Sequence, residues 1–263
     1  MELVGYLGAL VMGLLLGLIG GGGSIMTVPI LVYLFHVEPV MATACSLFIV
    51  GSTAAVGSAS HVRLGNVHWP TALLFGIPSI LAVFATRAWL LPALPDVWLS
   101  VGNTVITKPI GLLVLFALLM IAAAWTMIRP LKTSQSMEGG RHPWFALLDG
   151  AVIGTLTGLV GAGGGFLIIP ALVMLARLPM KQAVGTSLLI IAAKSLVGFM
   201  GDLQLGTSFH WPFLLTFVGV AVVGILLGSR LSRKVSDARL KTAFGYTVLV
   251  MGLWIIAHEL WLK

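Results

Sequence analysis

The stretch Gly17-Leu-Ile-Gly-Gly-Gly-Gly-Ser24 interrupts an apolar run over residues 3–35, and it returns in the second half of the chain as Gly158-Leu-Val-Gly-Ala-Gly-Gly-Gly165. The apolar arms around each stretch are too short and too broken by glycine to form one continuous membrane helix. A backbone that leaves the helical state inside lipid survives only where protein or a wet cavity replaces its lost hydrogen bonds. Two such breaks at matching places in two halves indicate a transport site.

The composition is that of an integral membrane protein. Hydrophobic residues make up 59% of the 263 residues and charged residues only 9%, against about 25% charged residues in a soluble domain. The apolar segments have the length of helices that cross a bilayer, about 20 residues, whereas barrel strands alternate in pieces of about 10 residues. The net charge of +7 comes from basic residues in short loops, where they orient a membrane protein, so nucleic acid is excluded as a partner.

The two glycine runs belong to an internal duplication. A single offset aligns glycines, prolines, alanines and serines of the two halves: Gly17 with Gly158, Pro29 with Pro170, Ala42 with Ala183, and Ser46 with Ser187. A shared spacing of residues with backbone meaning predicts a repeat. We expect a first membrane repeat over residues 1–130, a polar cytoplasmic linker over 131–143, and a second membrane repeat over 144–263.

Each broken segment either crosses the membrane as one bent helix or dips into it as a hairpin that leaves on the side it entered. If both cross, the basic loop residues divide 5 to 9 between the two sides; if both are hairpins, they divide 3 to 11. The second division follows the positive-inside rule more closely, and the arms beside the glycines are too short to be separate spans.

The predicted fold is therefore an all-α integral membrane protein of two inverted repeats. Each repeat consists of a glycine-broken re-entrant helix hairpin and three transmembrane helices. The protein would lie in the cell (inner) membrane as a multi-pass protein, with both termini outside the cytoplasm.

The glycine turns are the predicted binding site for an anion. At each break a helix begins inside the protein, and its N-terminus carries free N–H groups and roughly half a positive charge. The alternative is that these glycines, some of which stand at four-residue spacing, let helices pack closely. The residues assigned to the site are Gly20, Gly21, Gly22, Gly23, Ser24, Gly161, Gly163, Gly164 and Gly165.

Hydroxyl residues on the helices that follow the breaks would donate to the anion. They are Thr43 and Ser46 in the first half and Thr186 and Ser187 in the second. The alternative is that each hydroxyl bonds the backbone of its own helix.

Lys194 is the one basic residue that this assignment leaves inside a membrane segment, because Arg87 is counted among the loop charges. A charge at that depth is costly and marks a functional hypothesis. Lys194 lies seven residues after Ser187, so the two share nearly one helix face, and Lys194 would add positive potential to the anion site. The alternative is that Lys194 snorkels toward the helix end or pairs with Asp202 or Asp149.

His61 and Asp202 occupy matching positions at the ends of equivalent helices. Either residue would take up a proton in a coupled transport cycle, His61 being the natural titrating group near neutral pH. The alternative is that both are end residues at the membrane interface.

With these motifs the chain resembles the sulfite exporter TauE/SafE family, also called the TSUP permeases. The resemblance lies in the two glycine runs, in the prolines that follow them, and in the stretch Ala183-Val-Gly-Thr-Ser-Leu188. It implies transport of anions, typically sulfite, sulfonates or related sulfur-containing organic anions, often by export. The first half departs from the pattern at Met41-Ala-Thr-Ala-Cys-Ser-Leu47, where the second half has Gly-Thr-Ser.

The expected function is a membrane transporter that exports such anions by alternating access, with the anion held between the two glycine tips. A small-anion channel and an importer of a related anion stay open as alternatives. An enzyme is not expected, because the sequence has no HExxH or GxSxG motif, no pair of membrane carboxylates and no metal-ligand cluster. No cofactor or metal is expected. The expected partners are the small anionic substrate and the lipid bilayer, and a homodimer is left open.

Overall fold

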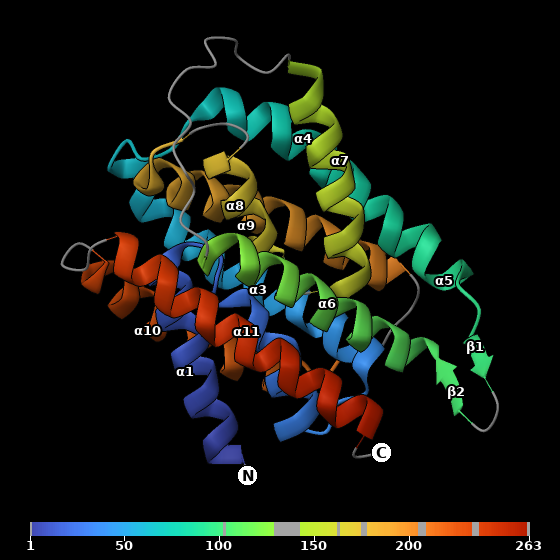
Figure 1. The fold of residues 1–263 in the computed structure, drawn as a ribbon. Helices are drawn as coiled ribbons and strands as arrows, with labels where there is room; N and C mark the ends of the chain where they lie inside the picture. The colour runs from blue at the N-terminus through green and yellow to red at the C-terminus, as the bar shows by residue number, and fades with distance from the viewer. Residues whose placement is uncertain are drawn as a thin grey trace.

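The computed structural model describes residues 2–101, 104–128, 143–161, 164–174, 178–204, 209–232 and 237–261. Helices account for nearly all of this part of the chain (Figure 1). The elements, in chain order, are α1 (Glu2–Ile19), α2 (Ser24–Pro29), η1 (Ile30–Leu34), α3 (Pro39–Arg63), α4 (Trp69–Ala85), η2 (Thr86–Leu90), α5 (Leu91–Ala93), β1 (Val97–Val101), β2 (Thr104–Thr107), α6 (Lys108–Ile128), α7 (Pro143–Val160), α8 (Gly165–Met174), α9 (Met180–Gln204), α10 (Trp211–Leu231) and α11 (Asp237–Trp261).

Long apolar helices make this a multi-pass membrane protein. Within the described residues, five helices are long and apolar enough to cross a membrane: Pro39–Arg63, Trp69–Ala93, Lys108–Trp125, Lys181–Gln204 and Trp211–Leu231. Large apolar side chains such as Leu73 and Val223 are more than half exposed, as expected where a helix faces lipid hydrocarbon instead of water. The prediction of a helical membrane protein is confirmed.

Within the described part of the chain, one short element is not helical. β1 and β2 pair antiparallel as a two-stranded hairpin between α5 and α6. The predicted linker over 131–143 lies outside the described residues except for Pro143, where α7 begins.

The chain leaves the helical path at both glycine runs, once between α1 and α2 and once between α7 and α8. Gly20, Gly161 and Gly164 have φ angles of +82°, +70° and +63°. This left-handed region is costly for residues that carry a Cβ, which explains why the turns are built from glycine.

At the first break the chain turns back on itself. The ring of Tyr6 in α1 packs edge-on against Phe35, just after η1, with 5.4 Å between centroids. Two residues further along α1, Gly8 lies against the side chain of Ile30. The second arm, α2 with η1, therefore runs antiparallel to α1.

Helices of the first half of the chain pack on helices of the second half. α1 packs on α10 and α7 packs on α4, while α3 packs on α9 and α6 packs on α11. α1 and α10 run in the same direction, since Gly13 lies against Ala221 and Gly17 against Ile225.

The central pair, α3 and α9, runs antiparallel. The Cβ position of Gly51 is 2.9 Å from Leu196, and that of Gly198 is 3.4 Å from Leu47. In Figure 1, α6 and α11 likewise run in opposite directions, because α6 starts beside β2 near the place where α11 ends. The apolar windows of α3 and α9 are 67% and 72% buried, against 33% for α10, so α3 and α9 form the centre of the molecule.

Arg87 is not a loop charge, which corrects the charge count made from the sequence. The helix that begins as α4 continues through η2 and α5 to Ala93, so Arg87 lies inside an apolar span. Its side chain is fully buried. Sequence reasoning placed it outside because Arg87 lies near the end of its apolar segment, where a long basic side chain usually reaches the interface.

Candidate functional site

The two glycine turns meet backbone to backbone. A Cβ built on Gly21 would lie 2.5 Å from the carbonyl oxygen of Gly165 and 2.7 Å from its Cα, and a Cβ on Gly165 would overlap Gly21 in the same way. Both glycines are buried. No larger residue fits at either position unless the turns move apart.

Two buried cations flank the second turn. The Nη2 atom of Arg87 occupies the space where a Cβ of Gly161 would be, and the Nζ atom of Lys194 is 2.7 Å from the Cβ position of Gly164. Arg87 is 0% and Lys194 1% exposed. Both positive charges therefore lie against the turn that follows α7.

Among the described residues, the groups that meet the first turn at the matching positions are uncharged. Gly20 lies against the side chain of Val184, and Gly23 lies against the backbone of Met12 and Leu16. The two turns are alike in their glycines and differ in the side chains that touch them. The positive charge of the site is thus asymmetric.

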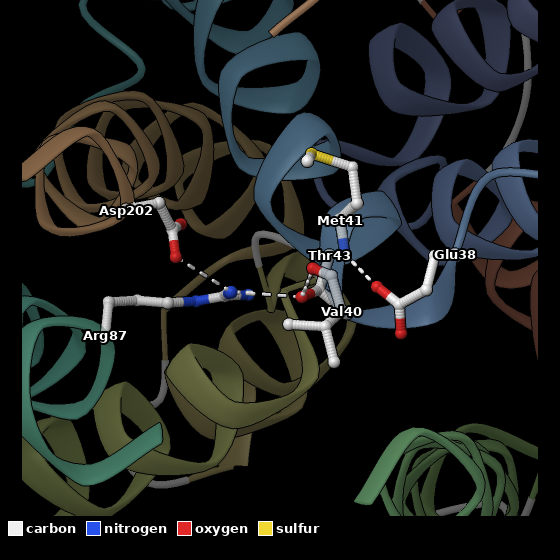
Figure 2. A network of polar contacts seen from close by, with 6 residues as sticks. All are labelled: Glu38, Val40, Met41, Thr43, Arg87 and Asp202. Atoms are coloured by element: carbon white, nitrogen blue, oxygen red, sulfur yellow. Dashed lines mark hydrogen bonds and ion pairs between the residues drawn. The ribbon is translucent and has the colours of Figure 1, made fainter. Parts of the chain in front are cut away.

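Arg87 is held from one side by Thr43 and Asp202 (Figure 2). Its Nη1 donates to Oγ1 of Thr43 at 3.0 Å and to Oδ1 of Asp202 at 3.3 Å, the latter contact being an ion pair. Thr43 in turn donates to the carbonyl of Val40 at 2.7 Å, so its oxygen lone pairs face the guanidinium. Glu38 caps the start of α3 by accepting from the N–H of Met41 at 2.9 Å, which fixes the turn that carries Thr43.

Arg87 lies in η2, a π-helical segment within an otherwise α-helical span. Such wide turns are often found at functional sites. The Nε and Nη2 atoms of Arg87 are buried and have no hydrogen-bond partner among the described residues.

Among the described residues, Lys194 is anchored by a hydrogen bond from Nζ to Oγ1 of Thr157 at 2.9 Å. Thr157 donates to the carbonyl of Gly154 at 3.1 Å, which leaves its oxygen to accept from the ammonium. The snorkelling alternative for Lys194 is wrong, because the side chain ends inside the protein against Gly164. Of the two carboxylates considered as partners of Lys194, Asp202 and Asp149, Asp202 forms an ion pair with Arg87.

The serines assigned to the site stabilise or adjoin the turns. Oγ of Ser24 donates to the carbonyl of Gly21 at 2.7 Å and closes the first turn. Oγ of Ser187 donates to the carbonyl of Val184 in its own helix at 2.9 Å and lies 3.3 Å from the carbonyl of Gly20. The own-helix alternative therefore describes Ser187, as it describes Thr43. Ser46 is fully buried, and its hydroxyl has no partner within the described part of the chain. Gly22 is buried in the first turn, whereas Gly163 lies outside the described residues.

The remaining predicted residues lie away from the glycine turns or pair elsewhere. Thr186 accepts from the N–H of His68 at 2.9 Å, so its hydroxyl stabilises the start of α4. His61 is near Gly185 at the start of α9, and Asp202 is at Arg87. Both His61 and Asp202 are buried within the protein, with 7% and 5% exposed, and lie near the ends of α3 and α9.

Comparison with known proteins assigns the chain to a protein family. The family model described as Sulfite exporter TauE/SafE matches residues 6–255. The chain belongs to this family. A probable membrane transporter protein of Xylella fastidiosa (strain Temecula1) is 30% identical over 251 residues, which cover 93% of this chain and 90% of the relative.

Two further relatives of this TauE/SafE protein carry the same description. The probable membrane transporter protein of Methanocaldococcus jannaschii is 27% identical, over 94% of this chain and 92% of its own length. YunE of Bacillus subtilis is 26% identical, over 94% and 95%. No solved structure matches the chain. The protein is a membrane transporter of the TauE/SafE family and not an enzyme, as its motifs predicted.

Sequence reasoning missed two residues of this candidate site, Arg87 and Thr157. The signal for Arg87 was its position within an apolar segment, at Ala85-Thr-Arg-Ala-Trp89, before Pro92 near the end of the helix. Thr157 precedes the second glycine run by one residue and is matched by Leu16 in the first half. This difference between the two halves is the sequence signal that different side chains surround the two glycine turns.

Proposed function

We propose that this protein transports a small anion by alternating access and holds it beside the two glycine turns. The proposed substrates are sulfite, sulfonates or related sulfur-containing organic anions, and the proposed direction is export, in keeping with the family's description. The observation that carries the proposal is the pair of buried cations, Arg87 and Lys194, against the second turn.

Charge balance supports an anion at this place. Two fully buried cations share one carboxylate, Asp202, in the described part of the chain. Burying an uncompensated charge costs several kcal/mol, and a bound anion would offset that cost. The N-terminus of α8, which begins at Gly165, adds a favourable dipole on the same side.

The contact between the turns suggests how the site opens. In this state Gly21 and Gly165 touch, so an anion would lie beside the contact, against Arg87 and Lys194, and not between those two glycines. We infer that one hairpin moves relative to the other during transport, which separates the turns and exposes the cations to one side of the membrane.

The inverted-repeat topology is part of this proposal. α3 and α9 are equivalent helices of the two repeats, and they run antiparallel. Two equivalent helices in contact run antiparallel only when the two-fold axis that relates them is perpendicular to both. Such an axis lies in the membrane plane and inverts the repeats. When Arg87 is no longer counted as a loop residue, the hairpin topology places 2 basic loop residues on one side of the membrane and 11 on the other. The positive-inside rule then favours an orientation in the inner membrane with both termini outside the cytoplasm.

The test is anion movement in everted membrane vesicles from cells that express the protein. We expect concentrative accumulation of labelled sulfite or a small sulfonate, abolished by an uncoupler. Gly164→Val, which overlaps Thr157, should abolish accumulation normalised to the amount of protein in the membrane, and Gly219→Val, in open space, serves as the matched control. Downhill movement that ignores the uncoupler would favour the channel, and movement unchanged in Gly164→Val would contradict the site.

A further inference from the structure

Among the described residues, the guanidinium of Arg87 makes its hydrogen bonds through one nitrogen. Nη1 donates to Thr43 and Asp202, while Nε and Nη2 are buried without a partner among the described residues. Nε and Nη2 form the side edge of the guanidinium plane, with two parallel N–H donors. This edge matches two oxygens of one carboxylate or sulfonate.

The free edge of Arg87 is directed at the second turn. Nη2 fills the space beside Gly161, whose positive φ and missing Cβ leave room for it. Lys194 meets the same turn at Gly164, three residues further on. Three residues span at most about 11 Å, so the two cations contact neighbouring positions of one short turn.

With Arg87 and Lys194 protonated and Asp202 ionised, the net charge of this cluster is +1. Arg87 and Lys194 contribute two positive charges, and Asp202, paired with Arg87, contributes one negative charge. All three side chains are buried, so solvent screens them little. A monovalent anion makes the cluster neutral, whereas a divalent anion leaves a buried negative charge.

We propose that the Nε–Nη2 edge of Arg87 and the ammonium of Lys194 form an oxyanion subsite of net charge +1, whose ligand is a monovalent oxyanion such as a sulfonate or a carboxylate. The inference rests on the proposed function and adds the valence of the substrate and a binding role for Arg87. Asp202 sets that valence because it cancels one of the two positive charges.

The test measures binding of two probes to the purified full-length protein by titration calorimetry. Methanesulfonate and sulfate share a tetrahedral sulfur with similar oxygens and differ by one charge at neutral pH. The parent should bind methanesulfonate at least 10-fold more tightly than sulfate. Asp202→Asn raises the cluster to +2 and should shift the preference toward sulfate by at least 10-fold, because a double negative charge is then neutralised.

A second variant separates the guanidinium edge from the charge. Arg87→Gln combined with Asp202→Asn removes the ion pair as a unit, leaves no stranded carboxylate, and keeps the cluster at +1 through Lys194. Methanesulfonate binding should fall at least 10-fold in this double variant. Arg87→Lys, which keeps the charge and loses the edge, should weaken methanesulfonate binding by a similar factor.

Three results would overturn the subsite: sulfate bound as tightly as methanesulfonate by the parent, an unchanged preference in Asp202→Asn, or parent-like binding in the double variant. The vesicle assay decides separately on the proposed function. Transport that depends on Gly164 but not on the edge of Arg87 would keep the transporter and remove the subsite. Absence of any anion movement would remove the proposed function itself.

Discussion

The Nη1 atom of Arg87 lies 3.3 Å from Oδ1 of Asp202, and the two side chains are 0% and 7% exposed. One residue comes from the π-helical segment of the first half and the other from the end of α9 in the second half. The ion pair therefore joins the two halves of the chain beside the turn that we assign to the anion.

Breaking this pair from one side should destabilise the protein more than removing both partners. Arg87→Gln strands a buried carboxylate and should cost about 3–5 kcal/mol, whereas Arg87→Gln with Asp202→Asn should cost clearly less. Unfolding of the detergent-solubilised variants, followed by thermal melting, measures the difference. A double variant as unstable as the sum of the two single variants would show that the pair contributes no coupling.

The contact of Gly21 with Gly165 should be intolerant of a single added methyl group. Gly21→Ala and Gly165→Ala each force the turns apart and should lower stability by about 1–3 kcal/mol, with a loss of transport. Gly219→Ala, which meets no atom within 4 Å, is the matched control and should behave like the parent. Melting temperature and vesicle transport are the readouts. If all three alanine variants behave alike, the turns do not need their close contact.

The sequence predicted the glycine turns well because its evidence for them is local. Glycine is required where φ is positive, and proline follows at the same spacing in both halves, so the repeat can be recognised from residue types alone. Lys194 was found for a similar reason, since a charge deep in an apolar segment is rare.

The polar surroundings of the second turn could not be predicted in the same way. Arg87 and Asp202 are 115 residues apart, and only the packing of α9 against η2 brings them together. Arg87 lies near the end of its segment, where sequence reasoning expects an interfacial cation. Thr157 is one of many Ser and Thr residues in the membrane helices, and its role depends on the position of the Lys194 ammonium, which donates to it.

The hairpin topology predicts on which side of the membrane the exposed residue His36, just after η1, will be found. In a background with Cys45→Ala, which removes the one natural cysteine, His36→Cys should react from outside the cell with a membrane-impermeant maleimide. Arg63→Cys, exposed at the other end of α3, should react only after the membrane is opened. The reverse pattern would mean that the first broken segment crosses the membrane.

Lys194 gives the most direct measurement of the central claim, that the second glycine turn holds the anion through buried positive charge. Lys194→Met keeps the length of the side chain and removes its charge, while Lys181→Met removes an exposed charge at the start of the same helix. Anion transport into vesicles, normalised to the amount of protein in the membrane, is compared for the parent and both variants. We expect Lys194→Met to lower the transport rate at least 10-fold, Lys194→Arg to restore it in part because the guanidinium is larger and planar, and Lys181→Met to leave it unchanged. Parent-like transport by Lys194→Met would contradict the account.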